Sequence, residues 1–215
     1  MIEIDALIFD LDGTLIDSAA DLIDSVRTFQ QRHGLPPGSE SLITSFVGDG
    51  VVALVQRAVP GLHGEKLRQG VDYFKRYYRR HCLDKTRLYP GVKDVLGHFR
   101  DKKLAVITNK PMRATQHILE GLGILSRFQV VLGGDSLPTK KPDPEPIRYA
   151  LMKMHVRDSH RAVVVGDSIN DILAGRRAGC CTCGVISCFG NPDQMRQAKP
   201  DKVVLNTLEL MRIFN

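Results

Sequence analysis

The sequence lacks a long apolar run, since none of its apolar stretches approaches the roughly 20 residues that would span a bilayer. It also opens on a short apolar strand instead of the basic and then apolar segment of a signal peptide. We therefore expect a cytoplasmic protein without a membrane partner. The 215 residues, 43% of them hydrophobic and 25% charged, suffice for one globular core domain and a smaller insert.

Two common phosphate-binding loops, G-x-x-x-x-G-K-[ST] and G-x-G-x-x-G, are missing, which argues against a P-loop NTPase and a dinucleotide enzyme. The separated cysteine pairs of a zinc site are missing as well, although the chain has five cysteines. Four of them crowd into one segment, where we expect reduced thiols in a late, buried strand: Cys180, Cys181, Cys183 and Cys188.

The net charge of +6 is moderate and could attract an anionic substrate. The basic stretch from Lys75 to His81 could instead contact nucleic acid. Such a stretch is more often the solvated face of a helix whose tyrosines pack inward. We expect the second arrangement and no nucleic-acid partner.

The rest of the chain is organised around its first strand, Ala6 to Phe9, which reads as buried on both faces. Asp10 and Asp12 follow it directly, and residues two apart on an extended chain point the same way. Gly13 then permits a sharp turn. Two converging carboxylates favour a hard cation such as Mg²⁺. The alternatives are a simple polar turn and a calcium loop, but the later acidic ligand of an EF-hand is missing.

Apolar strands alternate with helical segments, which predicts an α/β fold: a Rossmann-like, mostly parallel sheet with helices on both faces. Roughly 70 residues of helix separate the first two strands, although one crossover helix would suffice. We therefore predict a small inserted helical cap at residues 16–86, with residues 1–15 and 87–215 forming the core. The cap's first helix would be capped by Asp17-Ser18. The later strands are predicted at Leu104–Ile107, Phe128–Leu132, Ala162–Val165, Thr182–Ile186 and Val203–Leu205.

Polar residues repeatedly follow these strands. Thr108 follows the second strand, Lys141 lies in the loop after the third, and Asp167 follows the fourth. Together with Asp10 and Asp12 they would gather at one edge of the sheet. Acids, a hydroxyl, a cation and Mg²⁺ suit phosphoryl transfer through an aspartyl-phosphate, with a second acid protonating the leaving group.

These residues stand in four ordered motifs that closely resemble those of the haloacid dehalogenase superfamily of phosphohydrolases, and the resemblance covers nearly the whole chain. The motifs are Asp10-Leu11-Asp12-Gly13-Thr14, Thr108-Asn109, Lys141-Pro142 and Gly166-Asp167-Ser168-Ile169-Asn170-Asp171.

The resemblance implies that Asp10 is the nucleophile and that Asp12 is a general acid/base whose backbone carbonyl meets Mg²⁺. It implies phosphate contacts from Thr108, Asn109 and Lys141. Metal ligation would come from Asp10 and Asp167, with Asp171 as a further acidic partner acting through water or Lys141.

Within the superfamily, three segments are most similar to the group that hydrolyses 2-phosphoglycolate, and a cap segment resembles that group's substrate loop, with Gly48 and Gly50 against the substrate. We expect this small phosphomonoester as the first candidate substrate and a monomer or homodimer. A pyrophosphatase, a nucleotidase, a sugar-phosphate phosphatase, a β-phosphoglucomutase-like phosphomutase and a non-catalytic binding protein are the alternatives. The segments are Leu88–Val92, Thr108–Pro111, Lys141–Pro144 and, in the cap, Val47–Gly50.

Overall fold

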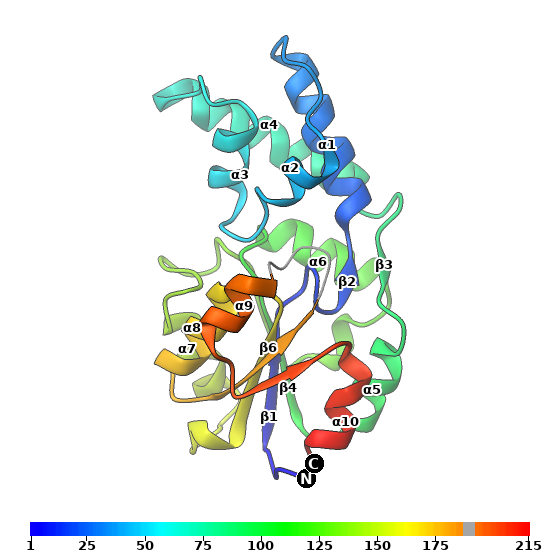
Figure 1. The fold of residues 1–215 in the computed structure, drawn as a ribbon, viewed down its shortest axis with the longest axis vertical. Helices are drawn as coiled ribbons and strands as arrows, with labels where there is room; N and C mark the ends of the chain where they lie inside the picture. The colour runs from blue at the N-terminus through cyan, green and yellow to red at the C-terminus, as the bar shows by residue number, and fades with distance from the viewer. Residues whose placement is uncertain (187–191) are drawn as a thin grey trace.

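The computed structural model describes residues 1–186 and 192–215, and its centre is one parallel six-stranded sheet with the order β5-β4-β1-β6-β7-β8 (Figure 1). Strand β1 lies in the middle and pairs with β4 on one side and β6 on the other. The strands are β1 (Ala6–Phe9), β4 (Lys103–Ile107), β5 (Val130–Leu132), β6 (Ala162–Gly166), β7 (Cys181–Val185) and β8 (Lys202–Val204).

Helices cover both faces of this sheet because residues along β1 alternate between two hydrophobic clusters. Ala6 and Ile8 pack with helices α7 and α8, whereas Leu7 and Phe9 pack with α5, α6 and α10. The predicted α/β architecture is therefore confirmed. The helices are α5 (Val92–His98), α6 (Met112–Gly121), α7 (Glu145–Lys153), α8 (Ile169–Arg177), α9 (Pro192–Ala198) and α10 (Leu210–Ile213), with 3-10 helices at Leu125–Arg127, Ser159–Arg161 and Thr207–Glu209.

A second, wholly helical lobe stands over the carboxyl end of the sheet (Figure 1). It contains α1 (Ala19–Arg32), α2 (Glu40–Thr44), α3 (Val51–Ala58) and α4 (Gly64–His81). Phe29 and Phe74 meet edge-to-face at its centre, with ring centroids 5.9 Å apart. The division at 15/16 and 86/87 stays a prediction. We call residues 16–86 the cap below.

A short antiparallel pair, β2 (Ile16–Asp17) with β3 (Arg87–Leu88), joins the two chain passages between the sheet and the cap. Strands of two residues are too short to show a periodic pattern, so this pair is not predictable from the sequence. Strand β5 is also shorter than the predicted Phe128–Leu132, since a 3-10 turn precedes it.

Cys180, Cys181 and Cys183 are free thiols in or beside β7, as expected, and Cys188 lies outside the described residues. In helix α4, Tyr78 is buried and packs inward. No helix in the described part of the chain is long and apolar enough to cross a membrane.

Candidate active site

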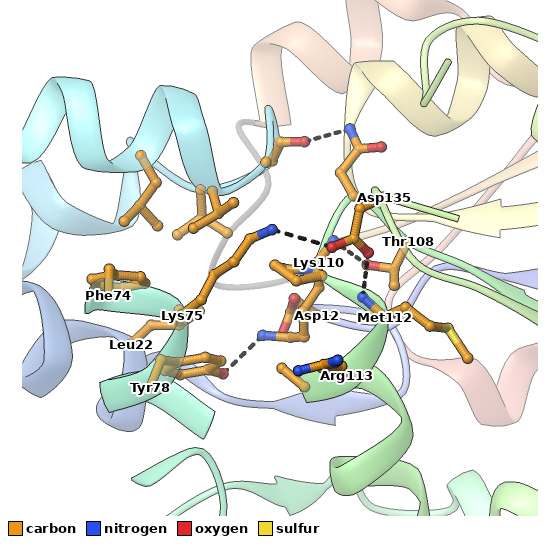
Figure 2. A pocket seen from close by; sticks show the side chains of 18 of the residues that line it. Asp12, Leu22, Phe74, Lys75, Tyr78, Thr108, Lys110, Met112, Arg113 and Asp135 are labelled. Carbon is orange, nitrogen blue, oxygen red and sulfur yellow. Dashed lines mark hydrogen bonds and ion pairs between the residues drawn. The ribbon is translucent and has the colours of Figure 1, made fainter. Parts of the chain in front are cut away.

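A cavity of about 770 Å³ lies between the carboxyl end of the sheet and the cap (Figure 2). The loops after β1, β4, β5 and β6 all contribute polar side chains to it, so the predicted gathering at one sheet edge is present. The cap contributes mainly apolar side chains and the basic side of α4. The polar core residues in the lining are Asp10, Asp12, Thr108, Asn109, Lys110, Arg113, Asp135, Lys141, Asp167 and Ser168.

Lys141 joins two carboxylates of the site. Its Nζ donates to Asp10 Oδ1 at 2.8 Å and to Asp171 Oδ1 at 2.5 Å. A further hydrogen bond goes to the backbone oxygen of Ile107, at 2.5 Å. An ammonium group has three N–H donors, and this geometry engages all of them. The lysine is therefore held in one position, with its side chain only 3% exposed.

Burial dominates the electrostatics of this group. Burial raises the pKa of Asp10 to about 6, and the neighbouring Asp171 adds to the rise, while Lys141 opposes it. Burial alone would lower the pKa of Lys141, but Asp10 and Asp171 outweigh it and hold that pKa above its ordinary value. The carboxylates of Asp10 and Asp171 thus share one buried lysine cation.

Asp10, Asp167 and Asp171 bring carboxylate oxygens within 4.8 Å of one another. This all-oxygen donor set fits a hard divalent cation and would relieve the repulsion among the carboxylates. The side chain of Asp12 is not part of this cluster, and its predicted metal contact through the backbone carbonyl stays a prediction. Asp171 is already engaged by Lys141.

The position of Asp171 depends on the end of β6. Its Oδ2 accepts the backbone N–H of Ser168 at 3.0 Å and the Ser168 hydroxyl at 2.6 Å, which caps helix α8. A Cβ on Gly166 would lie 2.2 Å from Cγ of Asp171. Only a glycine at the strand end leaves room for the capping carboxylate there.

Asp12 is held by two donors, and both reach Oδ1. Ser18 Oγ donates at 2.5 Å, and Lys110 Nζ lies 3.0 Å away. The helix cap predicted at Asp17-Ser18 is confirmed in part: Ser18 occupies the N-cap position of α1 but its hydroxyl makes no capping hydrogen bond, and Asp17 Oδ1 accepts the N–H of Ala19. The Ser18 hydroxyl therefore holds the carboxylate of Asp12 and does not cap helix α1.

Lys110 was not singled out as a site residue from the sequence. Its Nζ donates to the hydroxyl of Tyr78 at 2.8 Å and lies 4.5 Å from the centre of that ring (Figure 2). Lys110 directly follows the motif residues Thr108-Asn109 after the end of β4, and this position is the one sequence feature that indicates a place in the site. Tyr78 comes from the cap, so the pair also links the two lobes.

Thr108 and Asn109 directly precede Lys110 and are also buried. Thr108 Oγ1 accepts the backbone N–H of Lys110 at 3.2 Å. The side-chain amide of Asn109 donates to the backbone oxygens of Gly48 and Lys141, at 2.8 and 2.9 Å. Asn109 therefore ties the cap loop to the lysine loop, while its contact with phosphate stays a prediction.

The cap loop at Gly48–Gly50 is seated on the core through Asp49. Lys140 Nζ donates to the backbone oxygen of Asp49 at 2.5 Å, and the Asn170 amide donates to Oδ1 at 3.0 Å. Arg57 of the cap pairs with Oδ2 at 2.5 Å. Sequence reasoning named the flanking glycines as substrate contacts but missed Asp49, whose role depends on residues about 90 and 120 positions away.

Within the cap loop, Gly50 is the position where both the backbone conformation and the space for a side chain are restricted. Its φ of +87° is a left-handed conformation, and an added Cβ would lie 2.8 Å from Lys140 Nζ and 3.3 Å from the backbone oxygen of Asn109. We expect Gly50→Ala to lower kcat/KM by about tenfold, because alanine is strained at this φ and its methyl group would displace the Lys140 ammonium group that holds the loop. Steady-state kinetics with any accepted phosphomonoester measures this.

Gly34 supplies the matched control. Its φ is +70°, but nothing lies within 4 Å of an added Cβ. Gly34→Ala should lower the free energy of unfolding by about 1 kcal/mol through backbone strain alone and leave turnover unchanged. Equal losses of kcat/KM in the two variants would show that the contact of Gly50 with Lys140 and Asn109 does not matter for turnover.

Comparison with known proteins agrees with this geometry. Residues 7–185 match the model of the family described as haloacid dehalogenase-like hydrolase. A phosphoglycolate phosphatase from Chromobacterium violaceum is 40% identical over 189 residues, 85% of each chain, and one from Haemophilus influenzae is 36% identical over 96% of each chain. The crystal structure of a predicted phosphoglycolate phosphatase from Haemophilus somnus superposes with a TM-score of 0.91 at 34% identity, covering 98% of this chain and 97% of that one.

Proposed function

Because the chain belongs to the haloacid dehalogenase-like hydrolase family and is a phosphoric monoester hydrolase, we propose that it hydrolyses 2-phosphoglycolate to glycolate and phosphate with Mg²⁺. The observation that carries the proposal is the Asp10–Lys141–Asp171 group, with Asp12 in the same cavity. The choice of 2-phosphoglycolate as substrate follows from the phosphoglycolate phosphatases among the relatives.

In the first step, a carboxylate oxygen of Asp10 attacks phosphorus, and the bond from phosphorus to the ester oxygen breaks. The leaving oxygen keeps the electron pair and takes a proton from Asp12, which releases glycolate. Ser18 and Lys110 both reach Oδ1 of Asp12, so Oδ2 is the oxygen that faces the leaving group in this proposal.

In the second step, the Asp12 carboxylate takes a proton from water, and the water oxygen attacks phosphorus. The bond between phosphorus and Asp10 breaks, which regenerates the Asp10 carboxylate and releases inorganic phosphate. The sum is one ester and one water consumed for one alcohol and one phosphate formed. The cap over the cavity would keep other water out during the first step.

Asp10, Asp167 and the backbone carbonyl of Asp12 would hold Mg²⁺, with Asp171 behind them. When bound, the ion offsets the negative charge of nucleophile and phosphoryl group. Lys141, Thr108 and Asn109 would orient the phosphoryl oxygens in the same region. Gly48 and Gly50 would place the cap loop against the rest of the substrate.

Asp12→Asn tests the assignment of the acid. The amide cannot donate a carboxylic proton, so we expect a loss of about 10²-fold to 10⁴-fold with alkyl esters such as 2-phosphoglycolate. Phosphoenzyme formation from p-nitrophenyl phosphate should fall much less, because its leaving group needs no proton. Pre-steady-state release of p-nitrophenol measures that step. Equal losses with both esters would refute the acid role.

Phosphate release from a substrate panel, with Mg²⁺ and with a chelator, tests the proposed function. The panel contains 2-phosphoglycolate, sugar phosphates, nucleotides and pyrophosphate. We expect chelator-sensitive release with 2-phosphoglycolate ahead of the others. A different leading substrate would contradict the substrate assignment and favour the corresponding phosphatase. Conversion of a sugar phosphate into its isomer without free phosphate would favour a phosphomutase.

A further inference from the structure

The ammonium group of Lys110 lies in the wall of the cavity and is almost fully buried, with its side chain 4% exposed. Two of its three N–H donors are engaged, one by Asp12 and one by Tyr78. Lys141, the other buried lysine of the site, uses all three of its donors on protein oxygens. Among the described residues that line the cavity, Lys110 is thus the buried cation with a donor left for a ligand.

Lys110 lies close to the position that the leaving group must take. A leaving oxygen served by Asp12 lies within about 3 Å of an Asp12 oxygen. Lys110 Nζ is 3.0 Å from Oδ1 of the same carboxylate. In an ester of a 2-hydroxy acid, three bonds of about 1.5 Å or less separate the leaving oxygen from the carboxylate oxygens. The carboxylate therefore falls within reach of Lys110.

We propose that Lys110 binds the carboxylate of the leaving group and so selects phosphate esters of small 2-hydroxy acids over neutral esters. This inference rests on the proposed function and assigns the specificity of that site to one residue. A charge-assisted hydrogen bond from a buried ammonium group gives strong discrimination, because a neutral ester leaves the ammonium donor unpaired.

The other cations of the cavity are less suited to this role. Lys75 is committed to Asp135, with its Nζ 3.2 Å from Oδ2 (Figure 2). Arg76, Arg79 and Arg113 line the cavity with exposed side chains. Bulk water weakens the attraction of an exposed cation for a carboxylate, whereas a buried one retains it.

Tyr78 fixes the orientation of the ammonium group. Its hydroxyl accepts one hydrogen bond from Lys110, and its ring lies against the same group. Because Tyr78 belongs to α4, the cap helps to direct the remaining donor toward the substrate. Selection would then be complete only when the cap is in place.

The test compares 2-phosphoglycolate with ethyl phosphate, which has the same ester oxygen and no carboxylate. The readout is the ratio of the two kcat/KM values. We expect Lys110→Met to lower this ratio by about 10-fold to 100-fold relative to the wild type. Damage to Asp12 alone would slow both esters and leave the ratio unchanged, so the ratio separates binding of the carboxylate from positioning of the acid.

Lys110→Gln is the second variant, because an amide retains a donor for Asp12 and removes only the charge. It should turn over ethyl phosphate better than Lys110→Met and show the same lowered ratio. Lys75→Met is the matched control: it removes an equal charge from the same cavity and should keep the wild-type ratio. A ratio that falls in Lys75→Met or Arg113→Met but not in the Lys110 variants would overturn the assignment.

The wild-type ratio tests the proposed function separately. A wild-type enzyme without a preference for 2-phosphoglycolate contradicts the proposed substrate and, with it, this inference. A clear wild-type preference that survives in both Lys110 variants contradicts only the role of Lys110. A selective loss with pyrophosphate, and none with 2-phosphoglycolate, would show that the recognised anion is a phosphate and would also overturn the proposal.

Discussion

Asp10→Asn is expected to lower turnover of every phosphomonoester by about 10⁴-fold or more, because an amide is not a nucleophile for phosphorus. The substitution keeps the size of the side chain. Lys141 would retain its hydrogen bonds to Asp171 and to the Ile107 carbonyl. The loss should therefore appear in kcat, measured by phosphate release, without a change of fold in circular dichroism.

Thermal unfolding gives this variant a second readout. Burial raises the pKa of Asp10 to about 6, so its stabilising contribution is present below the unfolded pKa near 4 and is lost as the pH rises through 6. Above pH 6 and without Mg²⁺, Asp10→Asn should thus have a Tm no lower than that of the wild type. Asp5→Asn, at the other end of β1 and paired with Arg161, is the activity control. Normal turnover in Asp10→Asn would refute the nucleophile assignment.

Lys141→Met should be damaging in two ways. It leaves the buried carboxylates of Asp10 and Asp171 without their common cation, which should cost about 3–5 kcal/mol of unfolding free energy in metal-free protein. It also removes positive charge where the phosphoryl group gains electron density, which should lower kcat by about 10³-fold. Urea denaturation and steady-state kinetics measure the two effects.

The adjacent Lys140 provides the control for this variant. Its Nζ contacts the backbone oxygen of Asp49 and none of the three clustered carboxylates. Lys140→Met should therefore keep most of the unfolding free energy and lose less than about tenfold in kcat/KM. Similar losses at positions 140 and 141 would indicate that the local charge of the loop matters and that the placement of Lys141 does not.

The central part of the fold was predictable because its signals are local. The apolar run before Asp10 and the polar residues after each strand indicate a parallel sheet with its site at one edge. The grouping of Lys141 with the carboxylates follows from that topology. Four ordered motifs then identified the family before any distance was known.

The contacts that complete the site were not predictable in this way. The position of Ser18 before a helix predicts a helix cap, but its hydroxyl donates to Asp12. The two-residue strand β2, which directly precedes Ser18, places this hydroxyl beside the turn that carries Asp12. The roles of Lys110 and Asp49 depend on how the cap sits on the core. The placement of the cap on the core depends on contacts between side chains far apart in sequence, and no periodic pattern in the sequence indicates these contacts.

The most direct test of the proposed mechanism is chemical trapping of the phosphoenzyme. Enzyme turning over 2-phosphoglycolate is quenched in acid, digested and analysed by mass spectrometry, with Asp10→Asn treated in parallel. The proposed mechanism predicts a phosphoryl group on Asp10 that is absent from the variant. Rapid phosphate release with Asp10 unmodified at every quench time, or a phosphoryl group on another residue, would contradict it.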